Sequence, residues 1–144
     1  MKATFYLKTA SVLTFLHAAG HTIGAVFGAP DPGPMSIGAA AMKANHFNAL
    51  GANRTWWDFH MGEGLFGSLF LTMIAVLIWQ LAVLAKADPR RARPMMLTLA
   101  AAFLIGSCIA WRYFFAAPAI MEVVIAGLLG IAFVQASPPK ASGN

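Results

Sequence analysis

Long apolar stretches alternate with short polar segments along this chain of 144 residues. Four of the apolar stretches are long enough to form membrane helices, because such a helix needs about 20 mainly apolar residues. They cover approximately residues 5–27, 57–85, 94–113 and 118–136. The pattern therefore predicts an all-α fold, an integral membrane four-helix bundle that forms a single transmembrane domain over residues 1–144.

The first stretch has a second interpretation as a signal peptide, because Lys2 precedes it and small residues follow it. Its apolar part is longer than the core of about 7–15 residues that a signal peptide contains. It also carries His17 and His21. We therefore favour a membrane span and keep the signal peptide as the alternative.

Composition supports the membrane class. Hydrophobic residues make up 59% of the chain and charged residues 10%, whereas a soluble domain carries about 25% charged residues. So much apolar surface does not fit inside one small water-soluble core. The single cysteine, Cys108, lies inside an apolar stretch; it forms no intrachain disulfide, and a packing role is its simplest interpretation.

The positions of the charges predict an orientation. The net charge is +5, and four basic residues crowd the segment between the second and third stretches: Lys86, Arg90, Arg91 and Arg93. Basic loops stay on the cytoplasmic side of a membrane, so this segment and both termini are predicted to be cytoplasmic. Nucleic acid is not a predicted partner, because no basic face with stacking aromatic residues is present. The polar tail from residue 137 is predicted to be disordered.

The connection from residue 28 to residue 56 then faces outward. It opens with "GAPDPGP", whose prolines and glycines exclude a regular helix. The alanine-rich segment that follows predicts a short interfacial helix ending near Gly51. Aromatic residues favour the membrane–water interface, and the outer side gathers Trp56, Trp57, Trp111, Tyr113, Phe114 and Phe115.

Polar residues within the stretches are few, and each is costly in hydrocarbon, at about 2.5–3.5 kcal/mol for a charged side chain on insertion scales. At about 1.5 Å of rise per residue, His21 lies about 6 Å further out than His17, and Glu63 lies about 4.5 Å deeper than His60. His17 is predicted near the middle of its span, and the others are predicted in the outer half of the bundle, together with Arg112 and Glu122. Transport of ions is not expected, because no polar stripe continues to the inner side.

Their spacing suggests metal or haem chemistry. His17 and His21 are four residues apart and share a helix face, and His60 and Glu63 are three apart and share another. With Glu122, such residues on several helices can build a metal site, and two histidines can hold a haem. Simpler roles exist for each, so no cofactor is predicted and a metal or haem site is kept as an alternative.

The simpler roles are structural. His21 would bond a neighbouring helix through a ring nitrogen, and Glu122 would pair with Arg112. Asp58 would cap the second helix at its positive end, with Arg54 four residues before it as a partner. His60 and Glu63 would contact water near the surface.

Several segments together carry a resemblance to a known family. They are "GHTIG" (20–24), "MKANHF" (42–47), "RTWWDF" (54–59), the glycines Gly62 and Gly64, and "WRYFFAAP" (111–118). With them, nearly the whole chain resembles a family of small bacterial four-span inner-membrane proteins of unknown function. The resemblance implies a bacterial inner membrane and a shared role for His21, His46, Arg54, Asp58, Arg112 and Tyr113. In that family the stretch after "WDF" is more aromatic and apolar, so His60 and Glu63 depart from its pattern.

We expect an outward-facing pocket that binds a lipid-like or other amphipathic small molecule, because apolar walls with a few convergent polar groups suit such a ligand. Its predicted lining is His21, His46, Arg54, Trp57, Asp58, Arg112, Tyr113 and Glu122. Whether the protein is an enzyme stays open; His21 or Glu122 would move protons if it were. The alternative is a structural or accessory subunit, because Gly20 and Gly24 form a small-residue face that suits a homo-oligomer or a membrane-protein partner.

Overall fold

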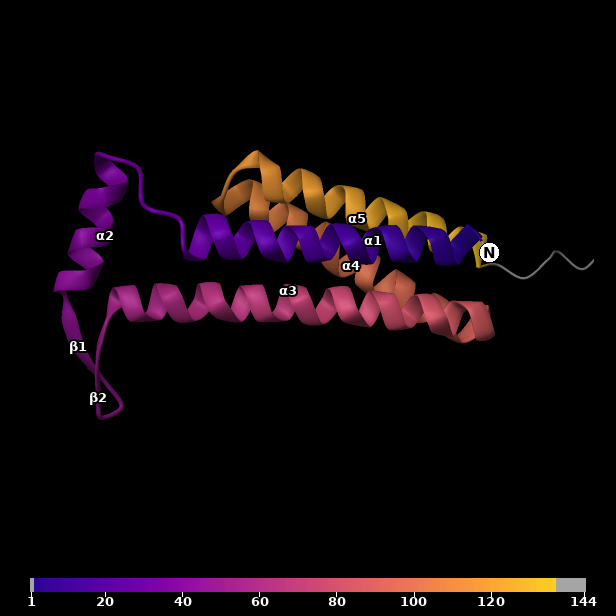
Figure 1. The fold of residues 1–144 in the computed structure, drawn as a ribbon, viewed down its shortest axis with the longest axis horizontal. Helices are drawn as coiled ribbons and strands as arrows, with labels where there is room; N and C mark the ends of the chain where they lie inside the picture. Colours follow the sequence, from indigo (N-terminus) through magenta and orange to yellow (C-terminus); the bar gives the residue numbers. More distant parts are fainter. Residues whose placement is uncertain (1, 137–144) are drawn as a thin grey trace, which may run out of the picture. The chain divides into compact units, whose positions relative to one another are not determined.

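The computed structural model describes residues 2–136, and the predicted disordered tail lies outside them. Residues 2–136 are mainly helical, with one small hairpin and short connections (Figure 1). In order, the elements are α1 (Lys2–Gly20), the π-helix η1 (His21–Val26), α2 (Pro34–Ala44), β1 (His46–Ala49), β2 (Ala52–Thr55), α3 (Trp56–Ala87), α4 (Pro89–Tyr113) and α5 (Ala116–Gln135). The all-α class predicted from the sequence is confirmed.

Within residues 2–136, three helices are long and apolar enough to cross a membrane, namely α3, α4 and α5. They match the second, third and fourth predicted stretches. The helix α1 is less apolar, because Lys8 and His17 interrupt it, and it is not among the three. The fourth span therefore stays a prediction.

The chain divides into two compact units, and the divisions fall inside α1 and α3. Among the described residues, unit 1 consists of residues 2–17 and 72–136, and unit 2 consists of residues 18–71. Each unit has its own packing.

Unit 1 contains an apolar core built from four helices. Its largest fully buried apolar side chains come from all of them: Leu7, Ile78, Leu81, Met96, Ile125 and Leu129. Alanines such as Ala82 and Ala126 are buried between these side chains and let the helices approach closely. The Ser11 hydroxyl donates to the carbonyl of Ala75 at 2.7 Å, which joins α1 to α3 inside this unit.

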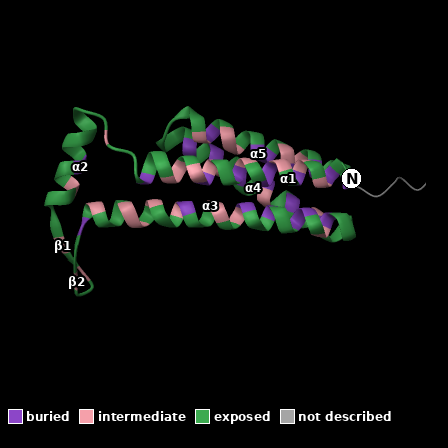
Figure 2. Ribbon diagram, viewed as in Figure 1, coloured by how far each residue is buried: buried purple, intermediate pink, exposed green. Residues whose placement is uncertain are grey.

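The outward faces of these helices carry large apolar side chains. Leu77 and Val83 on α3, Ile105 on α4 and Val134 on α5 are all exposed. Figure 2 shows exposed residues along every helix. A soluble protein rarely exposes such continuous apolar surface, whereas lipid covers it without penalty.

The basic segment is helical rather than a loop: Lys86 lies in the last turn of α3, and Arg90, Arg91 and Arg93 lie at the start of α4. The helix α4 begins at Pro89, five residues before the predicted start at residue 94. Asp88 is its N-cap: the side chain accepts from the Arg91 amide at 3.2 Å and pairs with Arg91 Nε at 3.1 Å. Proline at the first helical position and aspartate at the cap both start helices, and the sequence reading missed this combination.

Unit 2 contains the connection that precedes α3. Residues 28–33 are not helical, as the prolines and glycines predicted, and α2 begins at Pro34. The predicted end of this helix near Gly51 is wrong, because α2 ends at Ala44 and Asn45 takes an extended conformation. The next residues form an antiparallel hairpin in which Phe47 pairs with Arg54.

Candidate functional site

The residues predicted to line one pocket belong to both units. Unit 1 holds Arg112, Tyr113 and Glu122, and unit 2 holds His21, His46, Arg54, Trp57 and Asp58. Each unit provides its own local arrangement of these side chains.

His21 bonds a neighbouring helix, as predicted. Its Nδ1 lies 3.1 Å from Ser68 Oγ on α3. The ring packs against the α3 backbone, since a Cβ built on Gly67 would stand 3.1 Å from His21 Cε1 and 3.5 Å from Nε2. One turn earlier, a Cβ on Gly64 would stand 3.0 Å from Val26 Cγ2. Two glycines of α3 therefore let η1 lie directly on that helix.

The hydrogen bonds around Ser68 assign the His21 tautomer. Ser68 Oγ donates to the Gly64 carbonyl at 3.1 Å, so its only proton is already used. A neutral His21 ring that donates from Nδ1 satisfies both contacts of Ser68 at once, and in that tautomer Nε2 is the acceptor. His21 also begins the π-helix η1, a conformation that is frequent at functional sites.

Asp58 caps α3 as predicted, and the cap is reciprocal. Asp58 Oδ2 accepts from the Thr55 amide at 2.7 Å and from the Thr55 hydroxyl at 3.0 Å, while the Asp58 amide donates to Thr55 Oγ1 at 3.1 Å. This is a capping box with aspartate at the third helical position. Arg54 does not pair with Asp58 within residues 2–136; its Nη1 donates to the Asn53 carbonyl at 3.0 Å.

Aromatic rings surround the start of α3. Phe47 from the hairpin contacts Trp56 with ring centroids 4.8 Å apart, and Phe59 with centroids 5.4 Å apart. The Lys43 ammonium of α2 lies 4.4 Å from the centroid of Trp57. These contacts tie α2 and the hairpin to α3 inside unit 2. His46 begins β1 and is exposed.

The residues of the metal alternative also belong to both units. The His60 ring contacts the Trp57 ring at a tilt of 46°, with centroids 5.3 Å apart, and both His60 and Glu63 are exposed. His17 and Glu122 belong to unit 1. Among the described residues, no group of three or more His, Cys, Asp or Glu side chains is placed to hold a metal ion. The metal and haem alternative stays a prediction.

The predicted ion pair in unit 1 does not form. Within the part of the chain that the structure describes, Glu122 Oε2 is buried and has no hydrogen-bond partner. Arg112 instead lies over the Tyr113 ring, 5.2 Å from its centroid. The carboxyl group packs on α4, since a Cβ on Gly106 would stand 2.7 Å from Glu122 Oε2. The Arg112 guanidinium is exposed at the end of α4.

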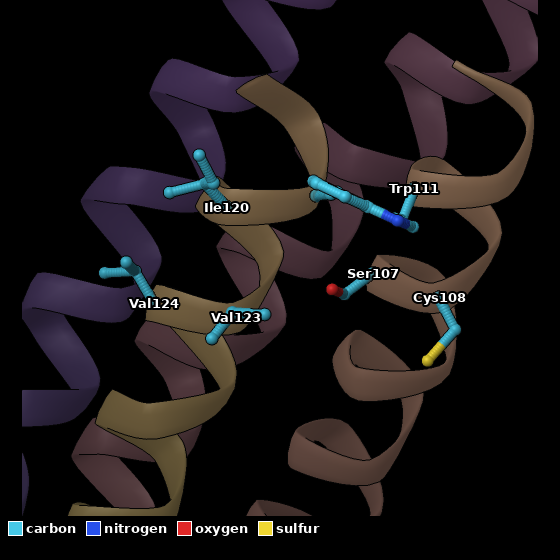
Figure 3. A pocket seen from close by; sticks show the side chains of 7 residues that line it. Ser107, Cys108, Trp111, Ile120, Val123 and Val124 are labelled. Carbon is cyan, nitrogen blue, oxygen red and sulfur yellow. The ribbon is translucent and has the colours of Figure 1, made fainter. Parts of the chain in front are cut away.

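Beside this end of α4 lies an open apolar groove in unit 1, here called groove 1, with a volume of about 460 Å³. It runs between α4 and α5, and Figure 3 shows the Trp111 ring reaching across from α4 towards α5. Its lining residues are Ser107, Cys108, Trp111, Ala119, Ile120, Val123 and Val124. A smaller groove of about 300 Å³, groove 2, lies between α1 and α3 and includes Val12 and Val76.

The sequence reading missed groove 1 and the role of Ser68. The sequence held a signal for Ser68 but none that was specific to the groove. Gly64, Gly67 and Ser68 are spaced three and four residues apart, so they form one small face of α3. The groove residues Ser107 and Ala119 are small and buried, while Ile120 and Val123 beside them are exposed. Gly20 and Gly24, which were expected to pack closely, have no heavy atom of the described residues within 4 Å of a built Cβ.

The fold and these sites define a class: a helical protein with three helices that can cross a membrane and an apolar groove beside an exposed arginine. Comparison of the chain with protein-family models, with curated proteins and with solved structures found no match.

Proposed function

We propose that the chain is a four-span protein of the bacterial inner membrane that binds a lipid-like amphipathic molecule along groove 1, with Arg112 at the polar end. The observation that carries the proposal is the juxtaposition of an apolar groove with an exposed guanidinium: Trp111 lines the groove, and Arg112 is the next residue. The proposal keeps Arg112 from the predicted pocket and assigns the apolar walls to α4 and α5.

The first helix completes the membrane domain in this proposal. The 19 residues of α1 span about 28 Å, and the 6 residues of η1 extend it by more than a turn. Together they match a hydrocarbon core about 30 Å thick. With Lys86 and the arginines that follow it on the cytoplasmic side, both termini are cytoplasmic and Arg112 lies at the outer interface.

Groove 1 suits the apolar part of a lipid. Its volume falls within the range of about 300–1,000 Å³ that is usual for small-molecule sites. Its walls are apolar except for the Ser107 hydroxyl, the Cys108 thiol and the Trp111 indole. The groove is open along its side, so a chain enters laterally from the bilayer.

The end of the groove suits an anionic headgroup. Arg112 is exposed and has no ion-pair partner within residues 2–136, so its guanidinium is available for two parallel hydrogen bonds to a phosphate. Its contact with the Tyr113 ring holds the side chain at the interface. The ligand class is therefore an anionic amphipathic molecule with at least one long apolar chain.

Native mass spectrometry of the purified protein tests the proposal with matched variants. Val123→Trp fills groove 1, whereas Val134→Trp adds the same bulk to an exposed valine of α5 outside the groove. Arg112→Gln removes the proposed headgroup partner, and Arg90→Gln removes an exposed arginine at the other end of α4.

We expect wild type, Val134→Trp and Arg90→Gln to retain a bound anionic lipid-like molecule. Val123→Trp should lose it, and Arg112→Gln should retain less of it or exchange it for a neutral one. Equal retention by Val123→Trp and Val134→Trp would place the ligand elsewhere, and a wild-type protein that carries no such molecule when extracted in mild detergent would refute the proposal.

A further inference from the structure

The tip of the hairpin carries an unusual residue. Only Leu50 and Gly51 separate the paired residues Ala49 and Ala52, and both have positive φ, at 51° and 92°. A two-residue turn with two positive φ angles favours Asn-Gly. Leucine in this left-handed conformation brings its Cβ too close to the following carbonyl oxygen, so the turn itself disfavours the residue found there.

The Leu50 side chain gains nothing from the rest of unit 2. Its relative exposure is 108%, so the side chain is as open as in an extended peptide. The hydrogen bond that stabilises the turn comes from another residue, because Asn48 Oδ1 accepts from the Gly51 amide at 2.7 Å. A large apolar side chain thus stands at the most exposed point of a strained turn.

The direction of the hairpin relative to α3 indicates that it lies at the membrane surface. Figure 1 shows α2 and the hairpin running crosswise to α3 at the amino-terminal end of that helix. Membrane helices tilt by only about 20° on average, so an element crosswise to α3 lies along the membrane plane. The strands connect directly to Trp56, where α3 begins, which keeps Leu50 near the depth of the interface.

The base of the hairpin is rich in aromatic residues, as is typical of the membrane–water interface. The rings of Phe47, Trp56 and Phe59 contact one another with centroids 4.8–6.1 Å apart, and aromatic rings concentrate at membrane–water interfaces. Trp56 and Phe59 remain half exposed, at 56% and 43%.

We infer that the hairpin is a membrane-surface anchor whose Leu50 side chain is buried at the boundary between lipid headgroups and acyl chains. Burial there removes the apolar side chain from water and offsets the strain of the turn. The site is separate from groove 1, so it stands whether or not the groove binds a lipid.

Site-specific fluorescence tests the anchor in liposomes of phosphatidylethanolamine and phosphatidylglycerol. Cys108→Ala removes the only native thiol, and Leu50→Cys then takes an environment-sensitive NBD label. Asp31→Cys in the same background is the matched control, because Asp31 is also exposed in the outer connection but has no apolar role. Quenching by iodide and by a headgroup-attached spin label reports water and lipid contact.

The label at position 50 should emit at shorter wavelength than the label at position 31. It should also resist iodide several-fold better, and be quenched by the spin-labelled lipid. Emission and iodide quenching equal to those at position 31 would overturn the inference. Resistance to iodide without quenching by the lipid label, lost on dilution of the protein in lipid, would assign Leu50 to contact with a second copy and would equally overturn it.

An unlabelled variant provides an independent test, because the two interpretations predict opposite changes in the rate of amide hydrogen exchange. Leu50→Asn creates the Asn-Gly pair that this turn favours. If Leu50 contacts water, the better turn slows amide hydrogen exchange in residues 46–55. If Leu50 is anchored in lipid, loss of the anchor makes exchange there faster in liposomes, while the same variant exchanges no faster than wild type in dilute detergent. Slower exchange in liposomes would contradict the anchor.

Discussion

Replacing Gly106 by alanine tests whether Glu122 is packed directly on α4. A Cβ at Gly106 would stand 2.7 Å from Glu122 Oε2, and ordinary contact begins at 3.4 Å, so the carboxyl group must move by 0.7 Å (3.4 − 2.7). Overpacking in a well-packed interior destabilises by about 1–3 kcal/mol. Gly→Ala in an uncrowded helix instead stabilises by about 0.5–1 kcal/mol.

Gly127→Ala on α5 is the matched control, because a Cβ there has no heavy atom of the described residues within 4 Å. The obstructing atoms belong to the free end of the flexible Glu122 side chain, which turns aside at a smaller cost than backbone would. Since both substitutions gain the same helix propensity, Gly106→Ala should be less stable than Gly127→Ala by about 1 kcal/mol, the lower end of that range. The assay is reversible unfolding of the purified protein in mixed micelles, followed by circular dichroism at rising denaturing-detergent fraction.

The same comparison in a Glu122→Ala variant tests whether the Glu122 carboxyl group causes the loss of stability. In Glu122→Ala the long side chain is gone, so Gly106→Ala and Gly127→Ala should agree within about 0.5 kcal/mol. The reasoning fails if Gly106→Ala is as stable as Gly127→Ala in the wild-type background. It fails as well if the loss is the same with and without the Glu122 carboxyl.

Three further predictions concern the caps and polar contacts, and the same unfolding assay checks their stability effects. Thr55→Ala removes the N-cap of α3 and should destabilise by about 1 kcal/mol; no loss would contradict the capping box. Ser68→Ala leaves the His21 Nδ1 proton without its acceptor and should destabilise by about 0.5–1.5 kcal/mol. In Ser68→Ala, nitrogen-15 NMR should show that His21 is no longer protonated only at Nδ1. An unchanged tautomer would refute the Nδ1-protonated form. Arg112→Gln should leave the free energy of unfolding unchanged, because Glu122 is not the partner of Arg112. A clear loss of stability would instead support the predicted ion pair between Arg112 and Glu122.

The sequence predicted the parts of the fold that depend on long apolar runs. The stretches around α3, α4 and α5 are each mainly apolar over about the thickness of a membrane's hydrocarbon core, which few other structures permit. The cap at Asp58 and the bond from His21 to another helix were also predicted correctly, because each follows from a local rule. These interpretations needed no knowledge of which helices are neighbours.

The missed features depend on tertiary contacts or on competition between local signals. The segment around Phe47 is rich enough in alanine to suggest a helix, but its ring packs on Trp56, and the Asn48 side chain stabilises the turn at Gly51. The Arg112–Glu122 pair was inferred from depth alone. Depth does not give the direction of a side chain around its helix, and that direction places Glu122 on Gly106.

Groove 1 was out of reach for a different reason. A groove arises from the gap between two helices, and the sequence does not specify how far apart α4 and α5 lie at Ser107 and Val123. A row of small residues beside larger ones is compatible with both close packing and an open groove. Only the positions of the two helices distinguish them.

Photochemical cross-linking with an anionic phospholipid that carries a diazirine in its acyl chain tests the central claim most directly. In native membranes or liposomes, mass spectrometry of the digested protein should place the adducts on residues 107–124, the two sides of groove 1. Val123→Trp should abolish them and Val134→Trp should not. Adducts spread evenly over the exposed apolar faces of α3, α4 and α5, with no change in Val123→Trp, would contradict a specific lipid site.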